Sequence, residues 1–420
     1  MAQLSDDCFA FGGPMMSVDE AVGLIAARLR AVQDIEAVRL RDADGRVLAR
    51  DIAAPAPLPP FTNSAVDGYA VRGSDLSDLA GAVAVFPVTG RVQAGFSAQQ
   101  PLQAGHAMRI FTGAPMPAGA DTVFMQEDVR LDEDGRVVFP QGLRPGANVR
   151  PAGEDIPAGH ASVKAGQRLR PQDVALMAAF GLTEIDVRRR VRVAVFSTGN
   201  ELVSPGDQRG EAQVFDSNRY MLMAMLVRLG CDVSDLGIIG DNRAALADSL
   251  NQVAGSHDLI LTSGGVSTGE EDHVKAAVES AGKLVLWRMA IKPGRPVAMG
   301  IIGGTPLIGL PGNPVASFVT FVHVVRPTVL ALAGAAQEPL VPLPVRAAFT
   351  YKKKIARREY VRVTLRKAQD GVLEATKFPR EGAGLLSSLV DTDGLVELSE
   401  DTTRVDPGQS VGFLYYASLV

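Results

Sequence analysis

Leu261–Lys275 reads LTSGGVSTGEEDHVK, and two further turns follow it, Lys292–Pro296 (KPGRP) and Gly309–Pro314 (GLPGNP). Each comes after an apolar run that is typical of a buried strand. Glycine-dense turns at the carboxyl ends of such strands are where open α/β sheets bind their ligands. The first turn also precedes an expected helix, whose N-terminal N–H groups and dipole favour anions. The sequence therefore predicts an α/β domain with an anion site at one edge of its sheet.

The rest of the chain predicts a multidomain α/β plus β protein. From Val191 to Leu310, apolar strands alternate with helices, which indicates a parallel sheet with right-handed crossovers. A capping box at Ser17 starts an amphipathic helix, and Asp42–Gly45 is predicted as the turn of a hairpin. We expect a discontinuous, elongated N-terminal lobe (1–57 and 149–188), a β-rich domain (58–148), the α/β domain (189–338) and a C-terminal β-barrel (339–420).

Composition narrows the class of protein. With 420 residues, 46% hydrophobic and 21% charged, the chain is typical of a soluble protein of several domains. A net charge of −5 gives no global basic field for nucleic acid. Cys8 and Cys231 form no zinc motif and favour a reducing compartment. The apolar run 318–336 is interrupted by polar residues and proline, so it predicts a buried helix. We expect a cytoplasmic protein with neither nucleic-acid nor membrane partners.

Gly265–Gly269 (GVSTG) also matches the nucleophile elbow of serine hydrolases. That mechanism needs a histidine later in the chain. Only His273 and His323 follow, one in the adjacent helix and one inside an apolar helix. We therefore interpret Ser267 as a ligand to phosphate rather than as a nucleophile.

Acidic residues at neighbouring strand ends predict a metal site beside the anion site. A carboxylate next to a polyanion repels it unless Mg²⁺ bridges the two. Asp272 alone could be a charge that the helix dipole favours, but Glu201 and Asp241 also end strands of the same sheet. The candidate metal ligands are Glu201, Asp241 and Asp272, and the candidate phosphate ligands are Ser263, Gly264, Gly265, Ser267 and Thr268.

Lys292 and Arg295 flank a stiff Pro-Gly turn and can hold a small tetrahedral oxyanion, although routine surface cations in a solvated turn remain an alternative. In Gly309–Pro314, Asn313 is predicted as the N-cap of a helix with Pro314 at its first position. Its tight backbone, including Pro311, permits close approach by a ligand.

Eight ordered motifs resemble the MoeA family of molybdopterin molybdenumtransferases, which is related to the C-terminal domain of gephyrin. They are PPFTNSAVDGYAV, TGAPMPAGAD, RPAGEDI, STGNEL, DSNRYML, TSGGVSTGEEDHVK, IKPGRP and GLPGNP. The resemblance implies a doubly wound molybdopterin-binding domain of the MogA type and an elongated homodimer. It also implies insertion of molybdate into the dithiolene of adenylylated molybdopterin, with Mg²⁺-dependent release of AMP.

The resemblance assigns roles to further residues. Asp67, Thr112 and Asp155 would complete the catalytic cleft from the other subunit, and Ser387 and Ser388 would border it from the barrel. Lys292 and Arg295 would bind molybdate or neutralise the anionic substrate. The expected protein partners are a molybdopterin adenylyltransferase and molybdoenzyme maturation proteins. Two other functions stay open: a non-catalytic scaffold like gephyrin, and a molybdopterin adenylyltransferase.

Overall fold

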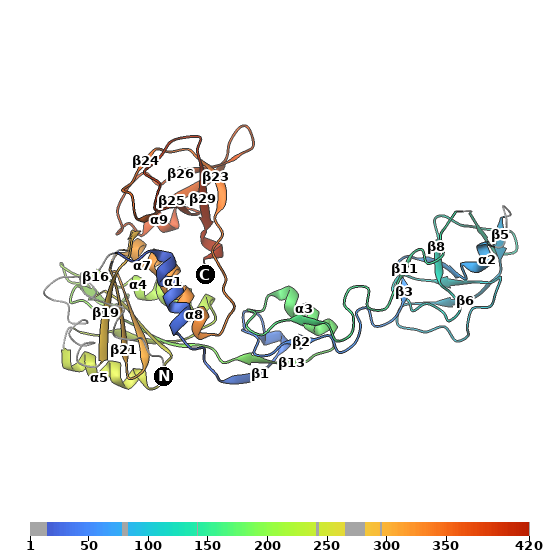
Figure 1. Cartoon of the computed structure of the whole chain (residues 1–420), viewed down its shortest axis with the longest axis horizontal. Helices are drawn as coiled ribbons and strands as arrows, with labels where there is room; N and C mark the ends of the chain where they lie inside the picture. The colour runs from blue at the N-terminus through green and yellow to red at the C-terminus, as the bar shows by residue number, and fades with distance from the viewer. Residues whose placement is uncertain are drawn as a thin grey trace.

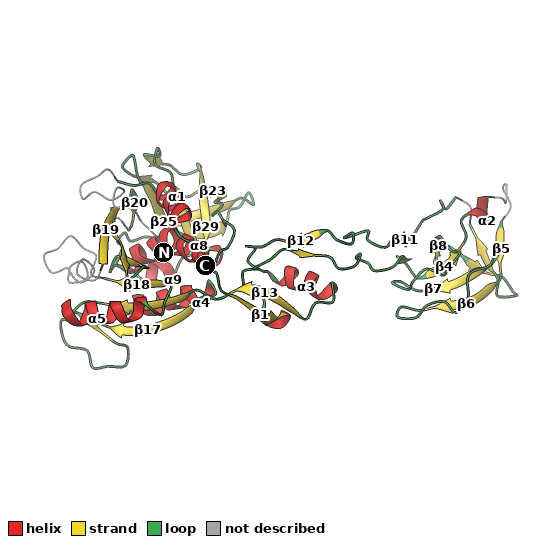
Figure 2. Cartoon of the chain, turned by 60° about the horizontal axis from the view of Figure 1, so that its bottom comes forward, coloured by secondary structure: helices red, strands yellow, loops and turns green. Residues whose placement is uncertain are grey.

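The computed structural model describes residues 15–77, 83–140, 142–240, 243–264, 282–294 and 296–419. The molecule is elongated (Figure 1): the α/β domain and the barrel lie at one end, the β-rich domain at the other, and the N-terminal lobe between them. Two extended segments, bridged at Leu58 and Ile156, join the lobe to the β-rich domain (Figure 2). The predicted fold class, an α/β domain of MogA type with a C-terminal barrel, is confirmed.

The α/β domain is built on a six-stranded sheet in the order β17-β14-β18-β22-β21-β19. Four strands are parallel, as predicted, but β21 pairs antiparallel with both β22 and β19. The short Gly303–Gly304 turn causes this difference, because it returns the chain directly as a hairpin. The strands are β14 (Arg192–Ser197), β17 (Asp232–Ile238), β18 (Leu259–Ser263), β19 (Gly282–Arg288), β21 (Pro296–Ile302) and β22 (Thr305–Leu310).

Helices cover both faces of this sheet because its central strands are apolar on both sides. Leu259 and Leu261 of β18 belong to one core cluster, whereas Ile260 between them belongs to another. The first cluster packs against α4 (Asn218–Arg228) and the second against α5 (Arg243–Ala254). After β14 in the chain, β15 (Leu202–Val203) and β16 (Val214–Phe215) form a separate two-stranded parallel sheet.

Helix α1 (Val18–Arg28) begins at the predicted capping box but packs on the α/β domain, although the sequence placed residues 1–57 with the N-terminal lobe. Its apolar side chains Val18, Ala21 and Ile25 join the large core cluster of the α/β domain. They recur at helical spacing and need an apolar partner surface, which α8 supplies.

The apolar run near the end of the α/β domain is the predicted buried helix. It comprises α7 (Pro314–Thr320), a π-helical segment (Phe321–Val325) and α8 (Arg326–Leu332). Its length and composition would suffice to cross a membrane, but 89% of its most apolar window is buried inside the protein. It is therefore a core helix of this domain.

The N-terminal lobe is discontinuous in sequence, since strands far apart in the chain pair within it. β1 pairs with β13 and β2 with β12, and helix α3 packs over them. The predicted hairpin at Asp42–Gly45 is therefore wrong: Gly45 turns with a φ of +72°, but the strand before it pairs with β13. The bounds are β1 (Ile35–Arg39), a 3-10 turn (Leu40–Asp42), β2 (Ile52–Ala53), β12 (Ala161–Val163), α3 (Pro171–Ala179) and β13 (Glu184–Arg188).

The β-rich domain contains two small sheets and a two-stranded neck. The sheets have the orders β6-β7-β4-β8 and β5-β10-β9, and β3 pairs with β11 in the neck. The bounds are β3 (Asn63–Ser64), β4 (Gly68–Val71), α2 (Ser74–Ser77), β5 (Ala84–Phe86), β6 (Val88–Val92), β7 (Ala107–Ile110), β8 (Thr122–Met125), β9 (Arg130–Leu131), β10 (Val137–Phe139) and β11 (Val149–Arg150).

The C-terminal domain is a closed barrel, because β25 pairs with both β26 and β27 and completes the ring β25-β26-β23-β29-β27. Strand β20 of the preceding domain adds to its edge through Lys292 and Glu359. The bounds are β20 (Ile291–Lys292), β23 (Leu343–Ala347), β24 (Tyr351–Lys352), β25 (Arg358–Lys367), β26 (Leu373–Lys377), α9 (Ser387–Val390), β27 (Gly394–Leu398), β28 (Arg404–Val405), β29 (Ser410–Tyr415) and a final 3-10 turn (Tyr416–Ser418).

Candidate functional site

Three loops converge at the carboxyl ends of the parallel strands β14, β18 and β22. Gly264, directly after β18, has a φ of +91°, and an added Cβ would lie 2.7 Å from the carbonyl oxygen of Thr198. A Cβ on Gly312 would lie 4.0 Å from the Cα of Gly264. Only glycine fits the first position, because its backbone is left-handed and touches the neighbouring loop. This is the sheet edge where the sequence predicted ligand binding.

Asn218, the first residue of α4, ties two of these loops together. Its amide nitrogen donates to the Ser263 hydroxyl at 2.9 Å and to the Gly312 carbonyl at 2.7 Å. Arg219, the next residue of α4, anchors the same turn: its buried guanidinium donates to Asp216 at 2.9 Å and also binds Asp235. The DSNRYML motif therefore fixes the edge of the site.

Ser263 and Gly264 are both occupied by contacts within the protein. The Gly264 N–H donates to the Leu310 carbonyl at 3.0 Å, and Ser263 is only 3% exposed. In this conformation they shape the loop, and the Gly264 N–H is not free for a ligand. The other predicted phosphate ligands, Gly265, Ser267 and Thr268, lie outside the described residues.

The predicted metal ligands are described only in part. Glu201 is exposed, and its carboxylate lies over Gly199, where an added Cβ would be 2.5 Å from Oε2. Asp241 and Asp272 lie outside the described residues, as does Arg295. Among the residues that are described, no group of three or more His, Cys, Asp or Glu side chains could hold a metal ion. Glu201 is exposed and can therefore act as a carboxylate ligand of Mg²⁺. The structure does not test Asp241 and Asp272 in this role.

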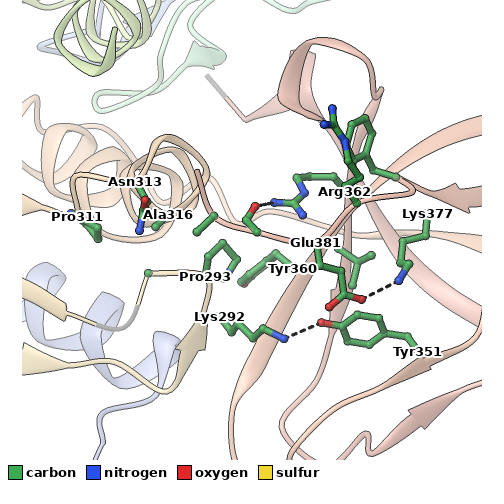
Figure 3. Close-up of a pocket in the computed structure, with 16 residues that line it drawn as sticks. Lys292, Pro293, Pro311, Asn313, Ala316, Tyr351, Tyr360, Arg362, Lys377 and Glu381 are labelled. Atoms are coloured by element: carbon green, nitrogen blue, oxygen red, sulfur yellow. Dashed lines mark hydrogen bonds and ion pairs between the residues drawn. The ribbon is translucent and has the colours of Figure 1, made fainter. Parts of the chain in front are cut away.

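A cavity of about 370 Å³ opens between the α/β domain and the barrel (Figure 3). The α/β domain contributes Lys292, the Pro293–Gly294 turn and the Pro311–Asn313 loop, so the cavity adjoins the sheet-edge loops. The barrel contributes aromatic and charged side chains on the opposite wall. Those barrel residues are Tyr351, Tyr360, Val361, Arg362, Lys377, Phe378, Arg380, Glu381, Gly382 and Ala383.

Lys292 is the best-fixed cation of this cavity. Its ammonium donates to the Tyr351 hydroxyl at 3.1 Å and lies 3.2 Å from Oε2 of Glu359. Burial alone would lower the pKa of Lys292, but its hydrogen bond to Tyr351 and the charge of Glu359 outweigh burial, so the pKa lies above its ordinary value. Burial, together with the hydrogen bond to Glu359, raises the pKa of Tyr351, so its hydroxyl stays protonated.

The barrel supplies further cations to the same cavity. The Arg362 guanidinium donates to the Gly382 carbonyl at 2.8 Å, and burial lowers its pKa without removing its charge. Lys377 binds Glu381 at 2.8 Å, and this hydrogen bond holds the pKa of Glu381 below its usual value. Among the described residues, the cavity is lined by four cations, since Arg380 joins Lys292, Arg362 and Lys377, and by the carboxylate of Glu381, with the buried Glu359 behind Lys292. The excess of positive charge suits a small anion.

The predicted binding residues around the cavity differ in their exposure. Asn313 is the N-cap of α7 with Pro314 at the first helical position, as predicted, but its side chain does not cap the helix and instead lines the cavity. Ser388 is fully buried, and its hydroxyl donates to the Leu385 carbonyl. Ser387 begins α9 and is exposed. Of the two serines, Ser387 is therefore the one accessible to a ligand.

Asp67, Thr112 and Asp155 lie in the β-rich domain and its neck, at the opposite end of the molecule from Lys292 (Figure 1). The Thr112 backbone N–H donates to Asp67 at 2.8 Å and its hydroxyl at 2.7 Å, and these bonds lower the pKa of the Asp67 carboxyl. Asp155 lines an open depression that also contains Arg150. One chain alone does not bring these residues to the cavity.

Sequence reasoning did not select Asn218, Tyr351, Glu359, Arg362 or Lys377. Arg362 and Glu359 lie in the same barrel strand, β25. No local signal in the sequence marks these side chains, because their position follows from the pairing of Lys292 with Glu359 across the two domains.

Comparison with known proteins identifies the family. The chain matches the MoeA N-terminal region (domains I and II) over residues 16–181, a probable molybdopterin-binding domain over 194–331 and the MoeA C-terminal region (domain IV) over 344–416. It is 36% identical to the molybdopterin molybdenumtransferase of Haemophilus influenzae, covering 94% of this chain and 98% of that one. The corresponding protein of Nostoc is 35% identical, with 95% and 93% covered.

A crystal structure of the molybdopterin biosynthesis MoeA protein from Pyrococcus horikoshii shares the fold, with a TM-score of 0.81 and 28% identity, covering 96% of this chain and all (100%) of that chain. The resemblance that the eight motifs predicted is therefore confirmed. The chain belongs to the MoeA family of molybdopterin molybdenumtransferases.

Proposed function

We propose that this protein inserts molybdate into the dithiolene of adenylylated molybdopterin and releases AMP. The observation that carries the proposal is the cationic cavity, which opens beside the sheet-edge loops of a molybdopterin-binding domain. An anion held there would lie next to a pterin nucleotide bound at the sheet edge.

Molybdate is a small tetrahedral dianion, and the cavity offers it fixed donors. Lys292 supplies an ammonium whose position is set by two partners, and Arg362 supplies a guanidinium anchored on the backbone of Gly382. Hydrogen bonds to charged groups are stronger than those between neutral groups. A site with several such donors would bind an oxyanion in preference to chloride or water.

The pterin nucleotide would occupy the sheet edge. Asn218 holds the loops after β18 and β22 in contact, so this edge is formed before the ligand arrives. Mg²⁺, held by Glu201 with Asp241 and Asp272, would neutralise the phosphates as the adenylyl linkage is cleaved. Because two of these acids lie outside the described residues, this role rests on the family resemblance.

We further propose that the working unit is a homodimer. Asp67, Thr112 and Asp155 lie at the far end of the chain from the cavity, so a second copy is needed to bring them to it. A two-fold interface would form two such composite sites.

Mixing two impaired variants tests the shared site. Asp67→Ala and Lys292→Ala subunits are combined after dissociation, and the formation of molybdenum cofactor and AMP is measured at a molybdate concentration too low to support either variant alone. If each site uses both subunits, mixed dimers contain one intact site and an equal mixture recovers about one quarter of the sites. A mixture that stays inactive although mixed dimers have formed would show that each chain acts alone.

The enzymatic proposal has its own test. Purified protein is incubated with adenylylated molybdopterin, Mg²⁺ and molybdate, and AMP is quantified. Molybdate-dependent AMP release supports the proposal. Failure to release AMP by a folded protein that still binds molybdopterin would instead identify a scaffold, and consumption of ATP would identify an adenylyltransferase.

A further inference from the structure

We propose that Glu359, a buried carboxylate of the barrel, is a positioning residue that together with Tyr351 fixes the Lys292 ammonium for the incoming oxyanion. This inference rests on the proposed function, since it concerns how the same cavity holds molybdate. Glu359 does not line the cavity itself, so it acts through Lys292 rather than by touching the substrate.

Both oxygens of Glu359 are fully engaged. Oε2 accepts a hydrogen bond from the Tyr351 hydroxyl at 2.8 Å and lies 3.2 Å from the Lys292 ammonium. Oε1 accepts from Nε of Arg357 at 2.6 Å. The residue is 0% exposed, and a buried carboxylate is tolerated only with such partners. The cluster is therefore a fixed element of the barrel wall.

The Lys292 ammonium has three N–H donors, and two of them are directed to Tyr351 and Glu359. The third remains for a ligand, and the side chain is 45% exposed towards the cavity (Figure 3). A lysine side chain is flexible and loses substantial rotamer entropy when it is fixed. Because the barrel fixes it in advance, less of that entropy is lost when the oxyanion binds.

Glu359 does not cancel the positive charge of the cavity. Arg357 and Lys292 together carry two positive charges against its single negative charge. By contrast, Glu381, the carboxylate partner of Lys377, is 63% exposed, so solvent screens that ion pair more than the pair of Lys292 with the buried Glu359. The geometry thus distinguishes a cation with a buried carboxylate partner from one with an exposed partner.

Glu359→Gln tests this role with a minimal change of shape. The amide has one acceptor oxygen for three donors, and its own N–H groups would oppose those of Lys292 or Tyr351. We expect the KM for molybdate to rise about tenfold while kcat changes little, as for a loss of binding alone. Glu374→Gln is the matched control, since that barrel carboxylate binds Arg346 at 2.8 Å outside the cavity.

A double-mutant cycle separates positioning from general damage. In a Lys292→Ala background, Glu359→Gln should leave the KM for molybdate unchanged, because the group that it positions is already missing. An equal rise in both backgrounds, or no rise in either, would overturn the inference. Tyr351→Phe keeps the Glu359 carboxylate and should raise the KM for molybdate by about threefold. If Glu359→Gln does not fold, Tyr351→Phe provides the decisive measurement, and an unchanged KM then refutes the positioning role.

The wild-type protein distinguishes this inference from the proposed function. If wild-type protein gives no molybdate-dependent product, the proposed function fails and this inference fails with it. If wild-type protein is active and the variants respond differently from the expectations above, only the role of Glu359 and Tyr351 is wrong.

Discussion

Gly294 lies in the turn that carries Lys292, and replacing it with alanine should damage both the stability and the molybdate affinity of the protein. Its φ is +115°, a conformation that residues with a Cβ rarely adopt. The added methyl would lie 2.4 Å from Oγ1 of Thr320 and 3.3 Å from the Ala316 carbonyl oxygen, both on α7. Thr320 is fully buried, so it has little room to move away.

Two costs add in Gly294→Ala. The unfavourable backbone conformation costs about 1–3 kcal/mol, and overpacking a buried contact costs about 1–3 kcal/mol more. For a domain of this size, each kcal/mol lowers the melting temperature by about 2–4 °C, so we expect a fall on the order of 10 °C. The turn can relieve the clash only by moving away from α7. That movement displaces Lys292, and the KM for molybdate should rise.

Second-site variants separate the two costs. The hydroxyl of Thr320 has no hydrogen-bond partner among the described residues, so its removal sacrifices no hydrogen bond. Adding Thr320→Ala to Gly294→Ala should recover about half of the lost melting temperature, because only the overpacking part is relieved. Adding Thr320→Val, which keeps a branch of the same size, should recover none. A Gly294→Ala protein with the wild-type melting temperature and molybdate KM would refute the reasoning.

Three further predictions concern residues outside this turn. Arg219→Met should destabilise the α/β domain by about 3–5 kcal/mol, because it leaves the buried carboxylate of Asp216 without its partner. Arg404→Met removes an exposed ion pair and should cost far less stability, since solvent screens such pairs. Denaturant titration of both variants measures the contrast. Asp272→Ala should abolish AMP release without lowering the melting temperature, and full molybdoenzyme activity in cells at ordinary molybdate levels would contradict its proposed metal role. Burial, with the charges of Arg358 and Arg326, lowers the pKa of His323 to about 3. As the pH drops from about 6.5 towards 3, the unfolded chain therefore takes up this proton first, and the stability of the folded protein should fall. His323→Phe, which can keep the stacking on Tyr360, should flatten that part of the stability profile, and an unchanged profile would exclude His323 as its cause.

Local patterns predicted the elements that make up the sheet edge. The apolar run at Leu259–Leu261 forms β18, and Gly264 has the left-handed backbone that such a turn requires. The same local signals could not identify the partners of each element. The strand before Gly45 is a strand as predicted, yet it pairs with β13 because the lobe closes on a segment far along the chain.

The cavity shows the same limit at the level of single residues. Lys292 was predicted from its stiff turn, but its partners Tyr351 and Glu359 come from the barrel. In the strand REYVRV, alternation places Glu359 on the same face as the apolar Val361 and Val363, but a glutamate is rarely buried unless it is paired. The partners that allow its burial are Tyr351, Arg357 and Lys292, and sequence periodicity does not identify them.

The contact between the α/β domain and the barrel explains why this cavity can be rigid in an otherwise extended molecule. Strand β20 pairs with β25, Arg358 of the barrel binds Asp19 of α1 at 2.8 Å, and His323 stacks on Tyr360 at 4.5 Å. Each contact joins the barrel to a different part of the α/β domain, so the cavity walls cannot move independently. The β-rich domain, by contrast, is joined to the rest of the molecule through two extended segments. The arrangement would combine a fixed site for the proposed oxyanion with a distant domain that the proposed dimer would bring to a second copy of the chain.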